Sequence, residues 1–302
     1  MWSNALTKIQ GLSFHPFHQN GFQAIPGLVS RAACQQLRER MSQLVEEFDP
    51  SQSPASIFDT EEQRRVQKTD LYLLDSYRKI SFFFEAGVFS PQGTLTKPKE
   101  LALNKVGHAL HTLDPVFREF CGAPEVGALM RGVGQQRPAV AQTMFIFKQP
   151  TVGGMVVPHQ DSSFLHTTPP SVVGMWLALE DATVENGCLW AVPGSHKNGL
   201  KKRFCLRTLP SGERETYFQG LEGCSHDHEY SIEGQVPLEA EAGTVILLHG
   251  ELVHMSHSNT SPHSRHAFTI HCVDMACEWF PGNWIATQDA FLPLPRATSC
   301  IP

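Results

Sequence analysis

The 302-residue chain is predicted to fold as a mainly β protein, a sandwich or barrel with helices packed on its outside. From about residue 138, short runs rich in β-branched and aromatic residues alternate with turns of Pro, Gly, Asn and Asp, a pattern typical of an all-β core. Before that point the pattern is mainly helical, and helices followed by strands indicate helices packed against a β-core. We expect one domain over 1–302, with a helical part at about 17–135 and the β-core at about 138–290.

The N-terminal part is expected to contain a short extended segment and several helices. Phe22 to Leu28 is predicted to be extended, and Ser30 is the expected N-cap of a helix whose apolar residues repeat at helical spacing as far as Phe48. The polar stretch 49–69 is predicted to be a surface loop. The remaining expected elements are an aromatic, buried segment over Leu71 to Phe84, a helix over Glu100 to His111, and a helix from Asp114-Pro115.

The β-core is expected to contain short strands separated by turns such as Glu185-Asn186-Gly187. The polar, Gly-containing stretch 197–237 is predicted to be a loop or lid. The predicted strands are Val140–Lys148, Val172–Leu179, Gly187–Val192, Gly243–His249 and His266–Val273.

Composition narrows the class of protein. With 24 basic and 30 acidic residues the formal charge is −6, which argues against a nucleic-acid partner. No run of about 18 apolar residues exists, so no membrane span is expected. The eight cysteines are scattered without a C-x-x-C motif, so neither a zinc knuckle nor a secreted disulfide framework is indicated, and a reducing compartment is predicted.

The cytoplasm is the predicted location, with the peroxisome as the alternative. The last residues, Ser299-Cys300-Ile301-Pro302, do not form a peroxisomal tail signal. Lys8-Ile9 and His15 stand at a spacing that resembles an amino-terminal peroxisomal signal, but Pro16 departs from its usual last residue.

His159-Gln160-Asp161 is the first candidate for a metal site. On an extended strand, residues two apart point to the same face, so His159 and Asp161 could offer one nitrogen and one oxygen to a single ion. A chain with 15 histidines also contains such pairs by chance, so the motif alone is a hypothesis.

His254 strengthens the hypothesis. It ends the apolar run from Gly243, which is interpreted as a strand that delivers an imidazole to the mouth of the barrel. His249 competes for the role, but five residues earlier on a continuous strand it would face the other way, and we expect it to be packed or hydrogen-bonded. Two histidines and one carboxylate form the facial triad that leaves open positions on iron(II). The other histidines of this region are expected to be solvent-facing or structural: His257, His263, His266 and His271.

Arg265 is expected to open the next strand. If that strand pairs antiparallel with the previous one, the guanidinium can point into the cavity that holds His254 and bind a carboxylate through two parallel hydrogen bonds. An ordinary surface arginine at the start of a strand is the alternative interpretation.

Together these residues resemble the phytanoyl-CoA dioxygenase family of iron(II)- and 2-oxoglutarate-dependent oxygenases. The resemblance covers about 17–290. It includes His159-Gln160-Asp161, His254-Met255-Ser256 with Asn259, Arg265, Phe17–Phe22, Asn104–His111, Phe145–Pro150, Glu185–Trp190 and Pro193–His196.

The resemblance implies a double-stranded β-helix (jelly-roll, cupin-like) core and an enzyme that consumes 2-oxoglutarate and dioxygen to hydroxylate a small organic substrate, with an acyl-CoA as one candidate. It implies that His159, Asp161 and His254 hold Fe(2+). The co-substrate would contact Arg265 and Ser256, and Lys105, Met144, Trp176 and Gln160 match further positions of its pocket, although strand alternation points Gln160 away from the iron.

Two other classes remain open at the level of sequence. A cupin-like metal protein with hydrolase or isomerase chemistry would not need Arg265, and a binding or sensor protein could keep the barrel without turnover. The carboxylate of Asp161 argues against a halogenase, since related halogenases leave that ligand position to halide.

Overall fold

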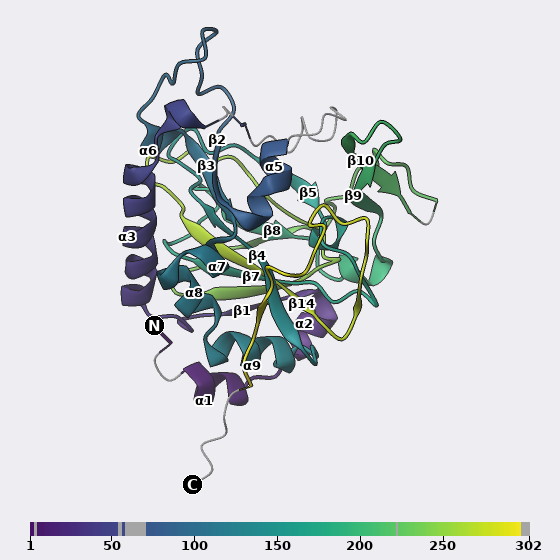
Figure 1. Cartoon of the computed structure of the whole chain (residues 1–302). Coiled ribbons are helices and arrows are strands. Elements are labelled where there is room, and N and C mark those ends of the chain that lie inside the picture. The colour runs from purple at the N-terminus through teal and green to yellow at the C-terminus, as the bar shows by residue number, and fades with distance from the viewer. Residues whose placement is uncertain (3–4, 54–55, 58–70, 222, 297–302) are drawn as a thin grey trace.

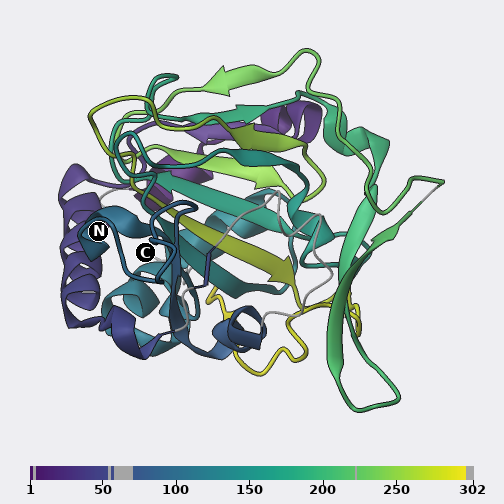
Figure 2. The same ribbon diagram turned by 90° about the horizontal axis from the view of Figure 1, so that it is seen from above.

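The frame of the protein is a pair of antiparallel sheets that face one another across a buried interior (Figures 1 and 2). The computed structural model describes residues 1–2, 5–53, 56–57, 71–221 and 223–296. The larger sheet has eight strands in the order β1 (Phe22–Ile25), β12 (Val245–His249), β7 (Val173–Ala178), β14 (Ala267–Asp274), β4 (Pro138–Ile146), β3 (Leu103–His108) and β2 (Ile80–Phe84), with β16 (Leu292–Pro293) also pairing with β4. The smaller sheet has the order β11 (Val236–Leu238), β8 (Leu189–Ala191), β13 (His254–Ser256) and β5 (Val156–His159).

Strand alternation divides the larger sheet into two apolar faces. On β7, Met175 and Leu177 point outward into a core shared with the helices, whereas Trp176 and Ala178 point inward toward the smaller sheet. The inner face therefore meets a second sheet and the outer face meets helices, which is how both faces of the larger sheet become buried.

The helices cover the outer face of the larger sheet (Figure 1). The longest begins where the N-cap was predicted, because the Ser30 side chain accepts a hydrogen bond from the backbone N–H of Ala33. The α-helices are α1 (Ala5–Gln10), α2 (His15–Asn20), α3 (Arg31–Glu47), α5 (Leu71–Asp75), α6 (Lys99–Ala102), α7 (Leu110–Leu113), α8 (Pro115–Cys121) and α9 (Pro124–Gly132). Short 3-10 turns occur at η1 (Pro50–Gln52), η2 (Ser76–Arg78), η3 (Asp161–Ser163) and η4 (Ser195–Asn198).

Two expectations about local structure are confirmed. The five predicted strands are present as β4, β7, β8, β12 and β14, with ends shifted by one or two residues. Phe83 and Phe84 are buried on β2, as expected of that aromatic segment. Seven cysteines among the described residues are free thiols, and Cys300 lies outside that part of the chain. No helix of the described ranges is long and apolar enough to cross a membrane.

The helix expected over 100–111 is wrong. Only α6 and α7 are helical there, and Leu103–His108 forms β3, which pairs with β2 on one side and β4 on the other. Backbone pairing on both edges outweighs the modest helix propensity of this segment. Lys105 therefore lies on a central strand.

The loop expected over 197–237 is also partly wrong. It contains an antiparallel hairpin, β9 (Lys202–Thr208) and β10 (Arg214–Gly220), which projects from one end of the molecule (Figure 2). A separate two-stranded antiparallel sheet consists of β6 (Thr167–Thr168) and β15 (Glu278–Trp279). Of the predicted 49–69 loop, residues 54–55 and 58–69 lie outside the described residues.

The single strand expected from Gly243 to His254 is divided in two. β12 ends at His249 in the larger sheet, and His254 opens β13 in the smaller sheet. Gly250 lies where the chain passes from the larger to the smaller sheet, close against β7. A Cβ at this position would lie 2.7 Å from the carbonyl oxygen of Val172, to which the Gly250 N–H donates, so only glycine fits there. Arg265 precedes β14, which pairs with β7 and β4, so the pairing with the previous strand that was considered for Arg265 does not occur.

Candidate metal centre

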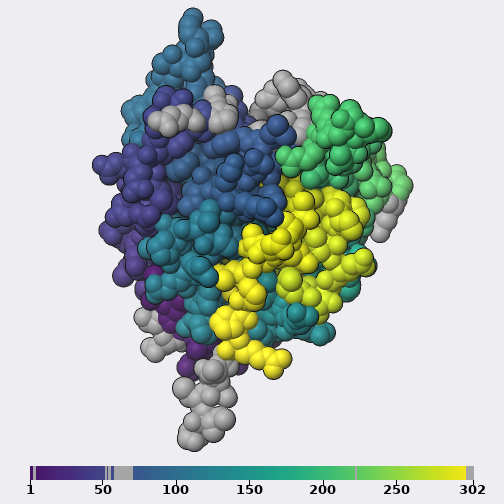
Figure 3. Space-filling model, in the orientation of Figure 1, coloured from purple at the N-terminus to yellow at the C-terminus, as the bar shows by residue number. Residues whose placement is uncertain are grey.

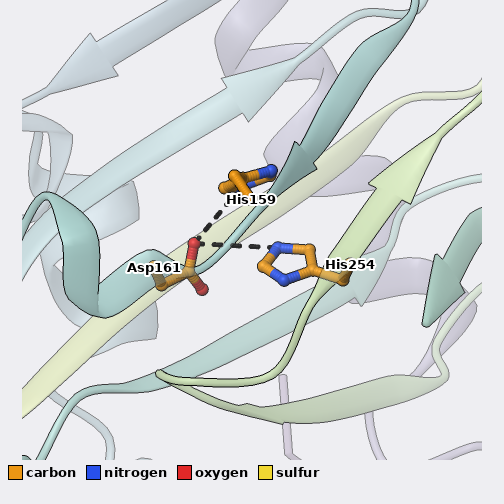
Figure 4. Close-up of side chains that lie close together, drawn as sticks. All are labelled: His159, Asp161 and His254. Carbon is orange, nitrogen blue, oxygen red and sulfur yellow. Dashed lines mark ion pairs between the residues drawn. The ribbon is translucent and has the colours of Figure 1, made fainter. Parts of the chain in front are cut away.

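Three side chains converge at one point between the two sheets. His159 ends β5, Asp161 opens η3, and His254 opens β13, directly across from His159 in the register of β13 and β5. Oδ1 of Asp161 lies 3.6 Å from Nε2 of His159 and 3.7 Å from Nε2 of His254 (Figure 4). One ligand atom from each residue lies within 4.8 Å of the others, so the structure brings the predicted triad together.

Backbone carbonyls fix the tautomer of both imidazoles. Nδ1 of His159 donates to the carbonyl oxygen of Val157 at 2.9 Å, and Nδ1 of His254 donates to that of Leu252 at 3.1 Å. A carbonyl can only accept, so each Nδ1 carries the proton and each Nε2 presents a lone pair to the common point. This is the arrangement that a metal ion requires of histidine ligands.

The triad also has the charge that a cation needs. Burial lowers the pKa of His254 to about 4, which keeps this imidazole neutral. Burial alone would raise the pKa of Asp161, but His271, His254 and His159 together hold it well below its usual range. The site thus combines a buried carboxylate, the neutral imidazole of His254 and the imidazole of His159, a donor set that suits iron(II) with open positions.

His271 is a site residue that the sequence analysis did not identify. It is buried on β14, and its Nε2 lies 3.2 Å from Oδ2 of Asp161. Its position in an apolar strand gave a signal: it shares the inward parity of Thr269, whereas Phe268 and Ile270 face the helices.

A cavity extends from the triad into the interior between the sheets. Its walls include five of the six residues predicted to bind the co-substrate, Lys105, Met144, Trp176, Ser256 and Arg265, together with Glu85 and Lys148. The sixth residue, Gln160, is placed elsewhere. Its amide donates to the carbonyl oxygens of Gly199 and Glu251 and accepts from the Lys201 N–H. Gln160 therefore links the backbone segments around residues 199–201 and 251 by hydrogen bonds.

Arg265 makes this cavity suitable for a carboxylate. The side chain is 1% exposed, its Nε donates to the carbonyl oxygen of Gly187 at 3.1 Å, and its guanidinium carbon lies 5.4 Å from the ring centroid of Trp176. Burial lowers its pKa to about 10, which leaves it charged at neutral pH. Nη1 is buried without a hydrogen-bond partner, and no acidic side chain in the described part of the chain forms an ion pair with it. A buried cationic donor in this state matches an anionic ligand.

A second cavity adjoins the first at the triad, and Lys105, Met144 and His271 line both. His159 and Asp161 line both cavities, so a metal ion held by them would face both. The walls of the second cavity are mainly apolar and aromatic, and the hairpin contributes Phe204 on β9 and Phe218 on β10. Together with Phe164 these rings form a packed group with centroids 5.2 to 6.1 Å apart. In Figure 3 the hairpin lies beside the C-terminal segment on the surface of the molecule.

Comparison with known proteins gives consistent matches. The family model described as phytanoyl-CoA dioxygenase matches residues 17–267. A phytanoyl-CoA dioxygenase of Arabidopsis thaliana is 45% identical over 92% of this chain and 93% of its own length. Phytanoyl-CoA dioxygenase domain-containing protein 1 of Mus musculus is 42% identical over 92% of this chain and 95% of its own length.

Solved structures with low sequence identity share the fold. The non-heme alpha-ketoglutarate-dependent carbocyclase SnoK, from nogalamycin biosynthesis, superposes with a TM-score of 0.63 at 16% identity, covering 95% of this chain and 98% of its own. EctD from S. alaskensis, solved with 2-oxoglutarate, gives 0.57 at 18% identity, covering 93% and 83%. The predicted jelly-roll core is confirmed by these similarities and by the two facing antiparallel sheets.

Proposed function

Because this chain belongs to the phytanoyl-CoA dioxygenase family, we propose that His159, Asp161 and His254 hold one iron(II) ion and that Arg265 binds 2-oxoglutarate beside it. The protein is an iron(II)- and 2-oxoglutarate-dependent dioxygenase. One observation supports the assignment of residues. Two Nε2 atoms and a carboxylate converge beside a buried guanidinium that forms no ion pair with an acidic side chain of the described residues. The same geometry supports a single oxygenase domain over 1–302, because both sheets contribute to it.

The chain's own residues have distinct tasks in this proposal. Bound iron would supply the oxygen chemistry, in which decarboxylation of 2-oxoglutarate to succinate accompanies hydroxylation of the substrate. Arg265 and Ser256 bind the distal carboxylate, and Lys105, Met144 and Trp176 line the rest of the cavity. Gln160 stays outside this set, since its amide is already occupied by the backbone. The apolar walls exclude water from the reacting centre.

The substrate is proposed to be a small organic molecule that places an apolar portion in the second cavity. Aromatic walls with few polar groups select for such a portion. An acyl-CoA meets this description, and the similarity to a phytanoyl-CoA dioxygenase of Arabidopsis thaliana supports it. The test is succinate formation above the substrate-free rate when candidate thioesters and the matching free acids are added.

The proposed compartment is the cytoplasm. In the segment that resembles a peroxisomal signal, Ile9 is buried on α1, and Pro16 departs from the usual last residue. Imaging of a tagged full-length chain tests this, and peroxisomal fluorescence would contradict it.

One assay tests the oxygenase function itself. Iron-loaded protein is incubated with 2-oxoglutarate and oxygen, and succinate is measured. We expect slow turnover even without the substrate and none above background in Asp161→Ala. If the wild-type protein forms no more succinate than Asp161→Ala, the proposed function is wrong, and a cupin-like metal protein or a non-catalytic binding protein replaces it.

A further inference from the structure

Lys148 is a buried lysine in the cavity of Arg265 that has no role in the function proposed above. It lies two residues beyond β4 and is 2% exposed. Its Nζ donates to Oγ of Ser256 at 2.8 Å and to the carbonyl oxygen of Gly154 at 2.6 Å. No acidic side chain among the described residues forms an ion pair with it. A buried amine without a carboxylate partner is uncommon and points to a ligand of opposite charge.

The backbone around Lys148 is held in an unfavourable conformation. Its φ is +43°, a left-handed value that side-chain-bearing residues rarely adopt. The conformation is fixed by hydrogen bonds to its carbonyl oxygen from Nδ2 of Asn259 at 2.9 Å and from the backbone N–H of Arg265 at 3.2 Å. Such strain persists where the surrounding structure demands a particular placement, and it is concentrated at functional sites.

Two glycines leave space for Lys148, Gly187 beside its side chain and Gly153 beside its backbone. A Cβ at Gly187 would lie 2.6 Å from Cε of Lys148, and a Cβ at Gly153 would lie 2.8 Å from its carbonyl carbon. The carbonyl of the same Gly187 accepts from Nε of Arg265, so one short turn shapes the surroundings of both cations.

We propose that Lys148 is a positioning residue of the co-substrate site, which holds the Ser256 hydroxyl so that its O–H donates to the distal carboxylate of 2-oxoglutarate. Burial and the neighbouring Arg265 hold the pKa of Lys148 well below its usual range. In its ammonium form Lys148 has donors alone, so Ser256 Oγ then accepts from it and the hydroxyl proton points elsewhere. Ser256 and the unpartnered Nη1 of Arg265 line the same cavity. An incoming dianion favours the ammonium form of Lys148 and so stabilises this arrangement.

The inference rests on the proposed function, and binding measurements separate the two. Dissociation constants are measured by calorimetry on anaerobic iron(II)-loaded protein for 2-oxoglutarate and for 2-oxopentanoate, which keeps the keto-acid end and replaces the distal carboxylate by a methyl group. Lys148→Met is expected to raise the Kd for 2-oxoglutarate about tenfold, as for loss of a charge-assisted hydrogen bond. The Kd for 2-oxopentanoate and the affinity for iron are expected to stay within twofold.

A double-mutant cycle distinguishes positioning from general structural support. If Lys148 acts through Ser256, the variant combining Lys148→Met with Ser256→Ala binds 2-oxoglutarate no more weakly than the weaker single variant. Lys99→Met removes a lysine that lies outside both cavities and donates to the carbonyl oxygens of Glu46 and Phe48, and it serves as the control, with an unchanged Kd. If Lys148→Met does not fold, Lys148→Gln is measured with the same expectations.

Three outcomes would overturn the inference: an unchanged Kd for 2-oxoglutarate in the Lys148 variant, additive effects in the cycle, or equal losses for 2-oxoglutarate and 2-oxopentanoate. Failure of the wild-type protein to bind 2-oxoglutarate would instead contradict the proposed function on which the inference depends.

Discussion

Nε2 of His271 lies 3.2 Å from Oδ2 of Asp161, whereas both imidazoles of the triad face the other oxygen, Oδ1. The amide Nε2 of Gln142 lies 3.1 Å from Nδ1 of His271 and donates to it, which leaves the ring proton on Nε2 facing Oδ2. The two oxygens of the Asp161 carboxylate therefore face different residues. The contact of Oδ2 with His271 fixes the rotation of the carboxylate, and this rotation directs Oδ1 toward the metal site.

Replacement of His271 is expected to weaken metal binding. His271→Leu removes the imidazole that lies 3.2 Å from Oδ2 and frees the carboxylate to rotate, and outer-shell substitutions of this kind cost about 10- to 100-fold in metal affinity. The measurement is competition with a chelating dye under anaerobic conditions. His257→Leu, outside both cavities, is the control and should bind iron(II) as the wild-type protein does. A His271→Leu affinity within twofold of wild type would contradict the assigned role.

Gly174 is expected to be necessary for the same carboxylate. It lies opposite His271 in the pairing of β7 with β14, and a Cβ there would lie 2.9 Å from Oδ2 of Asp161. Because ligand sets tolerate displacements of only about 0.5 Å, Gly174→Ala should lower iron(II) affinity about tenfold or more without removing a ligand. Gly11→Ala is the control, since its Cβ would have no neighbour closer than 3.7 Å. Equal iron titration curves for Gly174→Ala and Gly11→Ala would contradict this prediction, because they would show that the Asp161 carboxylate tolerates a Cβ at position 174 without loss of iron binding.

Arg265→Ala is expected to raise the KM for 2-oxoglutarate while iron binding stays largely intact. Loss of a buried charge-assisted pair costs about 2 kcal/mol or more, which corresponds to about 30-fold or more in affinity. Arg265→Met keeps more of the packing against Trp176 and should show a similar KM with a smaller loss of thermal stability. Loss of iron from either variant would contradict the assignment, because Arg265 would then support the metal site itself.

The sequence predicts most of the β-core because local patterns determine it. The apolar runs of β4, β7, β12 and β14 are each bounded by turn residues, and the strands begin and end close to those residues. Ser30 likewise caps α3 through a contact three residues away. His159 and Asp161 share a face because the chain stays extended through Gln160, whose φ is −118° and ψ 130°.

Contacts between distant segments explain what the sequence pattern alone does not predict. β3 exists because β2 and β4 flank it, and no local signal distinguishes it from a helix. His271 meets Asp161 only through the register of three strands and the turn after β5. Lys148 contacts a serine 108 residues away. Each depends on pairing across the barrel, which the alternation within a single strand does not specify.

Binding of 2-oxoglutarate is expected to weaken as the pH rises above neutrality, because of Lys105. Burial lowers the pKa of Lys105 to about 7, and Glu85 opposes only part of this effect. Below pH 7 the free protein already carries the ammonium that a dianion favours. Above pH 7 the amine must take up a proton on binding, so the Kd rises by up to about tenfold per pH unit.

The measurement is calorimetry of anaerobic iron(II)-loaded protein between pH 6 and pH 8, in buffers of different ionisation enthalpy that report proton uptake. Burial lowers the pKa of His254 to about 4, so this ligand stays neutral throughout the range and does not contribute to the slope. Lys105→Met should bind 2-oxoglutarate weakly, with a smaller dependence on pH and less proton uptake than the wild-type protein, because the buried Lys148 also has a pKa well below its usual range. A Kd that is constant with pH in the wild-type protein would show that Lys105 keeps one protonation state in the free and bound protein. A slope of wild-type size in Lys105→Met would assign the titration to another group.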